Sequence, residues 1–166
     1  TFKVIRVDLR GHGQSDLFET PYSIEILALD VIALLDHLKV KKCIFVGLSL
    51  GSMIGLWLGI YRPERLTRMI LAGASAKVVN KNSFYQRIAF IRHDGLHSTL
   101  SELNERWYHS DFVSRRPEIV ESIHAMLLRT SAEGYIAAMI AVRDFDVSAQ
   151  LTKIYTPTLL ITGVED

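Results

Sequence analysis

The chain has 166 residues, 49% of them hydrophobic, which is enough for one globular domain with a substantial core. Its formal net charge is +1 and charges of both signs are interspersed, which argues against a nucleic-acid or anionic-membrane partner and favours a small molecule. A single cysteine, Cys43, excludes an internal disulfide. No apolar run reaches about 18 residues and no signal-peptide pattern opens the sequence, so we expect a cytoplasmic protein.

The first expected elements are a strand and a helix. Residues 2–9 (FKVIRVDL) are strand-like from the outset, so the chain is expected to begin inside a longer domain. In the loop that follows, His12 stands between two glycines and is interpreted as a structural hydrogen-bonding residue. Ser23 is a candidate N-cap, and apolar residues three and four apart between Ile24 and Leu38 predict a helix that lies on a sheet.

The most informative stretch is residues 42–53 (KCIFVGLSLGSM), where an apolar strand-like run breaks at Gly-x-Ser-x-Gly and continues as a helix. In such a nucleophile elbow the serine lies on a strained turn with its hydroxyl exposed, and the residues two before and two after it must be small. Gly47 and Gly51 meet this requirement. Ser49 is therefore predicted to be a nucleophile; the alternative is a glycine-rich turn with an incidental serine.

Further elements predict a parallel sheet. The elbow helix is expected to end near Arg62, because Pro63 disfavours helical conformation in the residue before it. Residues 68–74 (RMILAGA) predict a short, fully buried strand. Strands that alternate with helices in this order predict a parallel sheet covered on both faces.

From about residue 76 to residue 146, helical periodicity replaces the strand pattern. Apolar residues share one face over residues 84–91 and another over residues 100–107, and Thr99 and Glu102 have the spacing of a capping box. Pro117 suits a first helical turn and Ser131 a helix cap. About four helices between two strands predict a lid.

Residues 157–163 (PTLLITG) predict a buried strand that leads to Asp166. A nucleophilic serine needs a histidine base that a carboxylate orients, and after a nucleophile elbow the chain order is serine, acid, histidine. Asp166 has the position of the acid; the alternative is a turn aspartate after Gly163. The histidine would then follow residue 166.

The histidines within the chain are not predicted to be catalytic. His93 and His97 have the spacing of a zinc-protease motif but lack its glutamate, so no metal site is expected. One oxyanion donor is expected in the backbone N–H of Leu50, and the second in a loop that precedes residue 1.

Three segments resemble the α/β-hydrolase superfamily: residues 10–16 (RGHGQSD), 47–51 (GLSLG) and 158–166 (TLLITGVED). Within the lid, the segments at 105–112, 125–130, 133–137 and 141–144 resemble the cap of 3-oxoadipate enol-lactonases. One departure is Ser52, where that family usually has a second glycine.

The resemblance implies an α/β-hydrolase fold, a mostly parallel sheet flanked by helices with an inserted helical lid. Residues 1–75 would form the first part of the core with the elbow, residues 76–147 the lid, and residues 148–166 the return to a core strand and the acid turn. The family's sheet has more strands than this chain supplies. We therefore expect a homo-oligomer, or further segments that complete the sheet.

The resemblance also implies a serine-dependent hydrolase that opens an enol-lactone in the β-ketoadipate pathway, without a metal or organic cofactor. Ser49 would attack the lactone carbonyl against the Leu50 N–H, and Asp166 would orient the histidine. By family position Trp107 would line the substrate pocket; the alternative is simple lid packing. Two other readings stay open: a general carboxylesterase or cofactor-free perhydrolase of the same fold, and an inactive fragment or non-catalytic ligand-binding protein.

Overall fold

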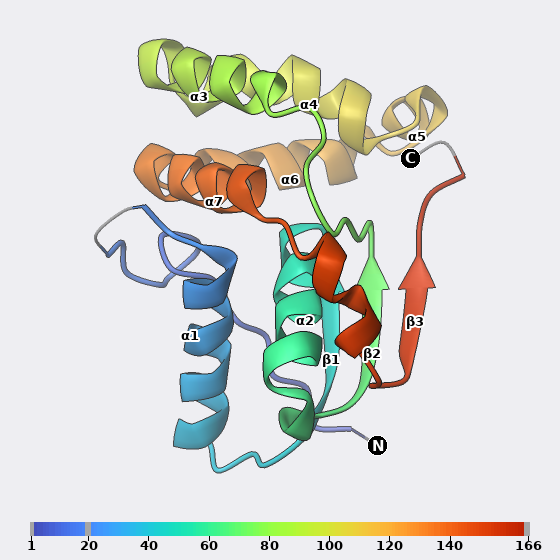
Figure 1. The fold of residues 1–166 in the computed structure, drawn as a ribbon. Coiled ribbons are helices and arrows are strands. Elements are labelled where there is room, and N and C mark those ends of the chain that lie inside the picture. Colours follow the sequence, from blue (N-terminus) through green and yellow to red (C-terminus); the bar gives the residue numbers. More distant parts are fainter. Residues whose placement is uncertain (1, 19–20, 165–166) are drawn as a thin grey trace. The chain divides into compact units, whose positions relative to one another are not determined.

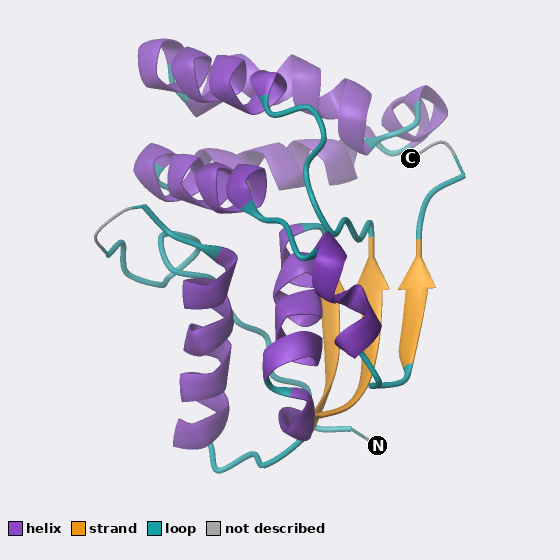
Figure 2. Ribbon diagram, viewed as in Figure 1, coloured by secondary structure: helices purple, strands orange, loops and turns teal. Residues whose placement is uncertain are grey.

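The computed structural model describes residues 2–18 and 21–164. The chain divides into two compact units: Thr1–Thr20 with Asn80–Met139, and Pro21–Val79 with Ile140–Asp166. The second unit contains the β-sheet, and the first is helical apart from its amino-terminal loop (Figure 2). Asp166, the expected catalytic acid, lies outside the described residues.

The described sheet has three parallel strands in the order β1-β2-β3: β1 (Cys43–Leu48), β2 (Leu66–Ala72) and β3 (Thr158–Ile161) (Figure 1). Leu48 is the register partner of Ala72, which in turn is the register partner of Ile161. The three strands therefore end together at one edge of the sheet. This confirms the α/β fold with a parallel sheet that the sequence predicted.

The unit with the sheet also contains two α-helices, α1 (Ile24–His37) and α2 (Leu50–Tyr61) (Figure 1). The Ser23 hydroxyl accepts a hydrogen bond from the Ile26 N–H at 3.2 Å, which confirms the predicted N-cap. Helix α2 packs against β1, β2 and α1, and its residues from Ser52 to Ile60 are all buried. A Cβ at Gly55 would lie 2.5 Å from the Leu71 side chain, so the glycine allows helix and sheet to approach closely.

The opposite face of the sheet is apolar and exposed in the described structure. Val46 and Leu48 have exposed fractions of 67% and 72%, and β3 is exposed throughout. The prediction of a fully buried strand at residues 68–74 is wrong, because β2 alternates between buried and more exposed residues, and the prediction of a buried last strand is wrong for the described residues of β3. The physical reason is that β3 has a single strand neighbour, β2, and lies at the edge of the described sheet.

The helical unit contains helices where the sequence predicted them, and two of the predicted helix starts are observed. Pro117 occupies the first turn of its helix, and the Ser131 hydroxyl accepts a hydrogen bond from the Gly134 N–H at 3.3 Å. The last helix begins in this unit and ends in the other. The described helices of residues 76–147 number five rather than about four: α3 (Asn82–Asp94), α4 (Leu100–Trp107), α5 (Ser110–Arg115), α6 (Pro117–Leu128) and α7 (Ala132–Asp144).

Two local predictions are wrong. Residues 2–9 form no strand, because a strand exists only within a hydrogen-bonded ladder and no described segment pairs with them. The capping box at Thr99 is also absent, since the Thr99 hydroxyl donates instead to the Leu96 carbonyl and Glu102 is paired with Arg87. No single helix in residues 2–18 and 21–164 is long and apolar enough to cross a membrane.

Candidate active site

Ser49 lies at the junction between β1 and α2, in a backbone conformation that side chains rarely adopt. Its φ is +51° and its ψ is −111°, in the region of positive φ that favours glycine. The Ser49 N–H donates a hydrogen bond of 2.9 Å to the carbonyl of Ala72, which ties the turn to the neighbouring strand. The serine residue is exposed. This is the geometry that the nucleophile-elbow pattern predicted.

The close approach of strand and helix at the elbow depends on Gly47. A Cβ at this position would lie 2.3 Å from the carbonyl oxygen of Gly51, a contact with backbone that no side-chain rotation can relieve. Gly51 itself has open space: a Cβ there would meet no described atom within 4 Å. The expected need for a small residue therefore holds at Gly47 and does not hold at Gly51 among the described residues.

Ser52 supports the elbow from inside the protein. Its side chain is fully buried, and its hydroxyl lies 2.6 Å from the Ser49 carbonyl oxygen and 3.4 Å from that of Gly73. The backbone N–H groups of Ser52 and Met53 also donate to the Ser49 carbonyl, at 2.9 and 3.1 Å. Sequence reasoning treated Ser52 as a merely tolerated small residue. A hydroxyl where the family usually has glycine was the feature that could have revealed this role.

Leu50 opens α2, so its N–H is among the first four of the helix, which have no intrahelical acceptor. The amino end of a helix also carries a partial positive charge. A negative charge that develops next to Ser49 would be stabilised by both effects.

Of the other predicted site residues, Trp107 is described by the structure and Asp166 is not. The Gly73 N–H donates to the Ile161 carbonyl at 2.9 Å, so the chain leaves β3 at the same edge of the sheet as Ser49, on the way to Asp166. Trp107 belongs to the other unit, where it ends α4 with an exposed fraction of 47%. Its ring is edge-on to that of Tyr108, with centroids 6.4 Å apart.

Comparison with known proteins decides the family. A family model described as "Serine aminopeptidase, S33" matches residues 1–166. The chain belongs to this family. Its fold is that of the α/β-hydrolases, as the structural neighbours below confirm.

The chain is 40% identical to 3-oxoadipate enol-lactonase 2 of Acinetobacter baylyi over 163 residues, covering 98% of this chain and 61% of that protein. The crystal structure of the enol-lactonase from Burkholderia xenovorans LB400 has a TM-score of 0.92 at 31% identity, over 95% of this chain and 60% of that one. A hydrolase from Pseudomonas aeruginosa PA01 has a TM-score of 0.89 at 38% identity, over 94% and 59%. The chain thus spans about three-fifths of the length of these relatives.

Within this member of the serine aminopeptidase family, several described histidines have local partners. His12 Nδ1 lies 3.2 Å from the Arg10 carbonyl, in agreement with a structural role, and His124 Nε2 lies 2.7 Å from the Asn104 side-chain oxygen. The described residues contain no group of three or more His, Cys, Asp or Glu side chains that could hold a metal ion.

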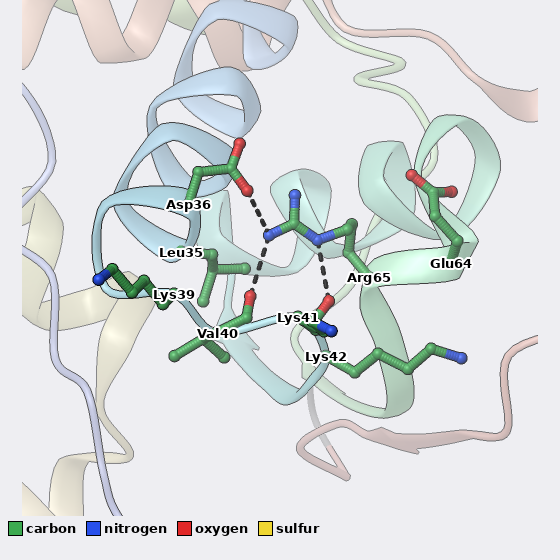
Figure 3. A pocket seen from close by; sticks show the side chains of 8 residues that line it. All are labelled: Leu35, Asp36, Lys39, Val40, Lys41, Lys42, Glu64 and Arg65. Carbon is green, nitrogen blue, oxygen red and sulfur yellow. Dashed lines mark hydrogen bonds and ion pairs between the residues drawn. The ribbon is translucent and has the colours of Figure 1, made fainter.

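An open pocket of about 420 Å³ lies at the other end of the sheet from Ser49, beside the starts of β1 and β2 (Figure 3). Arg65 crosses it: its Nε donates to the Lys41 carbonyl and its Nη2 to the Val40 carbonyl, each at 3.0 Å. Nη2 also lies 2.7 Å from Asp36 Oδ1. The guanidinium therefore links the end of α1 to the start of β2, which is a structural role.

Cys43, at the start of β1, is not an activated nucleophile. Burial raises the pKa of its thiol, and the charge of Arg65 acts in the opposite direction. A raised pKa keeps the thiol protonated at neutral pH. Ser49, in contrast, is exposed at a turn with positive φ between β1 and α2.

Proposed function

We propose that the protein is a serine-dependent hydrolase that opens an enol-lactone, like 3-oxoadipate enol-lactonases. The observation that carries the proposal is the conformation of Ser49: a non-glycine residue at φ +51°, exposed at the amino end of a buried helix. Strained backbone of this kind is kept where it serves a function. The similarity to an enol-lactonase at 40% identity supports the substrate class.

In this proposal a histidine takes the proton of the Ser49 hydroxyl as its oxygen attacks the lactone carbonyl. The tetrahedral oxyanion forms against the Leu50 N–H and the amino end of α2. Collapse of this intermediate breaks the ring C–O bond and expels an enolate, which is a more stable leaving group than an alkoxide and takes up the proton held by the histidine to become the enol. Water then hydrolyses the acyl-enzyme, and the enol tautomerises to a 3-oxo acid.

The remaining members of the site are part of the same proposal. Asp166 would orient the histidine and stabilise its charged form, and that histidine would follow residue 166. Residues 76–147 would act as a lid over the reacting bond, with Trp107 lining the pocket. No metal or organic cofactor enters any step. We also propose that the reaction belongs to the β-ketoadipate pathway and takes place in the cytoplasm.

A fluorophosphonate probe tests the nucleophile in the intact protein, because it forms a covalent bond with an activated serine. We expect one label per chain at Ser49, located by peptide mass spectrometry, and none after Ser49→Ala. Ser101→Ala is the matched control, since Ser101 is an exposed serine of α4, and it should label normally. A wild-type protein that takes no label, or a label that survives Ser49→Ala, would remove Ser49 from the chemistry.

The substrate class needs a second measurement. Turnover of 3-oxoadipate enol-lactone should exceed that of p-nitrophenyl acetate in kcat/KM, and Ser49→Ala should abolish both. Equal or greater activity on the simple ester would instead assign a general carboxylesterase. The similarity to a thermophilic esterase from Thermogutta terrifontis, 27% identical with a TM-score of 0.86, makes this the relevant second candidate.

A further inference from the structure

The peptide group between Ala72 and Gly73 lies at the end of β2, the strand between β1 and β3. Its carbonyl accepts a hydrogen bond of 2.9 Å from the Ser49 N–H, and its N–H donates one of 2.9 Å to the Ile161 carbonyl. Because a peptide group is planar and rigid, its carbonyl and its N–H cannot turn independently. One peptide group therefore ties the turn that carries Ser49 to the end of β3.

Gly73 sets the direction of this peptide group. Its φ is +54°, in a region that glycine adopts freely and that residues with a side chain reach only at a cost in energy. The Gly73 carbonyl lies 3.4 Å from the hydroxyl of the fully buried Ser52. A residue with a Cβ would favour negative φ. Rotation to that value would swing either the preceding peptide group away from Ser49 and Ile161, or the Gly73 carbonyl away from Ser52.

The direction of the Ser49 side chain depends on the two peptide groups that flank its Cα. The one after Ser49 is held by the first turn of α2, where the N–H groups of Ser52 and Met53 donate to the Ser49 carbonyl at 2.9 and 3.1 Å. The one before Ser49 is held through its N–H, whose one acceptor among the described residues is the Ala72 carbonyl. Loss of this contact would let the strained φ of Ser49, +51°, relax.

We propose that Gly73 is a positioning residue for the reaction at Ser49. Its positive φ keeps the Ala72–Gly73 peptide group directed at both neighbours, so that the nucleophile and the strand that leads to Asp166 stay in one fixed arrangement. Gly73 offers no side chain to the reaction and acts through its backbone alone. The inference rests on the proposed function, because it assigns a role in the chemistry of the same serine.

The kinetic test compares Gly73→Ala with Gly73→Asn in the intact protein. Both variants add a Cβ, but asparagine adopts positive φ more readily than alanine does. We expect Gly73→Ala to lower kcat for 3-oxoadipate enol-lactone by roughly tenfold or more and to change KM by less than about twofold, because a small displacement of a reacting group is costly. Gly73→Asn should restore most of the loss.

The matched control is Lys39→Val. Lys39 has a φ of +56° and lies in the turn between α1 and β1, at the other end of the sheet from Ser49. A β-branched residue is strained at this φ, so the variant should have a lower melting temperature and an unchanged kcat. The control thus separates strain in the backbone at large from strain beside the nucleophile.

Amide hydrogen exchange, measured by NMR, tests the same contact without catalysis. The reference is the amide of the buried Met69, which donates to the Pro157 carbonyl at 2.9 Å and so makes the same kind of bond further back along β2. In Gly73→Ala, the exchange rate of the Ser49 amide relative to that of Met69 should rise by roughly tenfold or more. In Gly73→Asn this ratio should stay near its wild-type value.

Each measurement can overturn the proposal. Wild-type kcat in Gly73→Ala, or a loss of the same size in Gly73→Asn or Lys39→Val, would remove the positioning role. An unchanged exchange ratio in Gly73→Ala would remove the contact on which that role depends. If the wild-type protein hydrolyses neither 3-oxoadipate enol-lactone nor p-nitrophenyl acetate, the proposed function fails instead, and the exchange ratio still decides whether Gly73 holds the turn.

Discussion

The Ser52 hydroxyl donates a hydrogen bond of 2.6 Å to the carbonyl oxygen of Ser49, from a fully buried position on the first turn of α2. Its second acceptor, the Gly73 carbonyl at 3.4 Å, follows the end of β2. One side chain thus links the strained turn to the neighbouring strand. The strain at Ser49 persists only while its surroundings oppose relaxation, and Ser52 is part of those surroundings.

Removal of this hydroxyl should weaken both the fold and the proposed reaction. We expect Ser52→Ala to lower the free energy of unfolding by about 0.5–1.5 kcal/mol, the usual worth of one hydrogen bond, because two backbone N–H donors still satisfy the Ser49 carbonyl. Under the proposed function, kcat should fall while KM changes little, since Ser52 does not contact the substrate. Thermal denaturation and steady-state kinetics check the two effects. Unchanged kcat with lowered stability would limit Ser52 to a structural role.

The strain at Ser49 predicts a trade between stability and activity. Glycine adopts positive φ freely, so Ser49→Gly should stabilise the protein by about 1 kcal/mol while it abolishes the proposed hydrolysis. Ser49→Ala removes the same hydroxyl and keeps a Cβ, so it should abolish activity without this gain. The difference in thermal stability between the two variants measures the free-energy cost of a side chain in the positive-φ conformation at residue 49. Equal stability of the two variants would show that the turn stores no strain.

The sequence predicted the helices, the parallel strands and the elbow because each of these depends on local pattern. Apolar spacing and a serine cap define α1, and the small residues around Ser49 define the elbow. Whether a strand is buried depends on segments that are distant in the sequence. The composition of β3 is that of a buried strand, but its burial requires a second neighbouring strand or a helix packed on it. Residues 2–9 failed as a strand for the same reason.

The sequence also did not predict which side chains pair with one another. The spacing of Thr99 and Glu102 suits a capping box. The Glu102 carboxylate is instead ion-paired with Arg87, a buried arginine on another helix. Nothing in the spacing of Arg87 and Tyr135 shows that both lie near Glu102, because that depends on how three helices pack. Within the site, Ser49 was predictable and the role of Ser52 was not.

The two glycines of the elbow should respond in opposite ways to alanine. At Gly47 a Cβ would lie 2.3 Å from backbone, so Gly47→Ala should cost about 3 kcal/mol or prevent folding. At Gly51 the space is open and the residue is helical, so Gly51→Ala should stabilise the protein by about 0.5–1 kcal/mol. Chemical denaturation of both variants checks this. A Gly51→Ala protein destabilised as much as Gly47→Ala would show that the elbow needs small residues on both sides.

The ion pair at Glu102 predicts an acid-sensitive contribution to stability. Its hydrogen bond from Arg87 holds the pKa below the ordinary value of 4.5, so the folded state binds the proton less readily than the unfolded state. The stabilisation is therefore complete above pH 4.5 and is lost as the pH falls through the lowered pKa. Glu102→Gln should lower the melting temperature at pH 7 and have less effect near pH 3. The exposed Glu105→Gln serves as control. A difference that does not depend on pH would contradict the ionic origin.

The exposed apolar face of the sheet predicts self-association of the 166-residue chain when it is produced alone. Val46 and Leu48 of β1 and Leu159 and Ile161 of β3 are all exposed, and large apolar patches drive association. Val46→Lys should raise the concentration at which dimers form by roughly tenfold or more, because a lysine charge must be desolvated in the contact. The matched control is Val79→Lys, since Val79 is 88% exposed and lies outside the strands. Sedimentation velocity across a concentration series measures the effect. A wild-type chain that stays monomeric at every concentration would show that this face does not drive association.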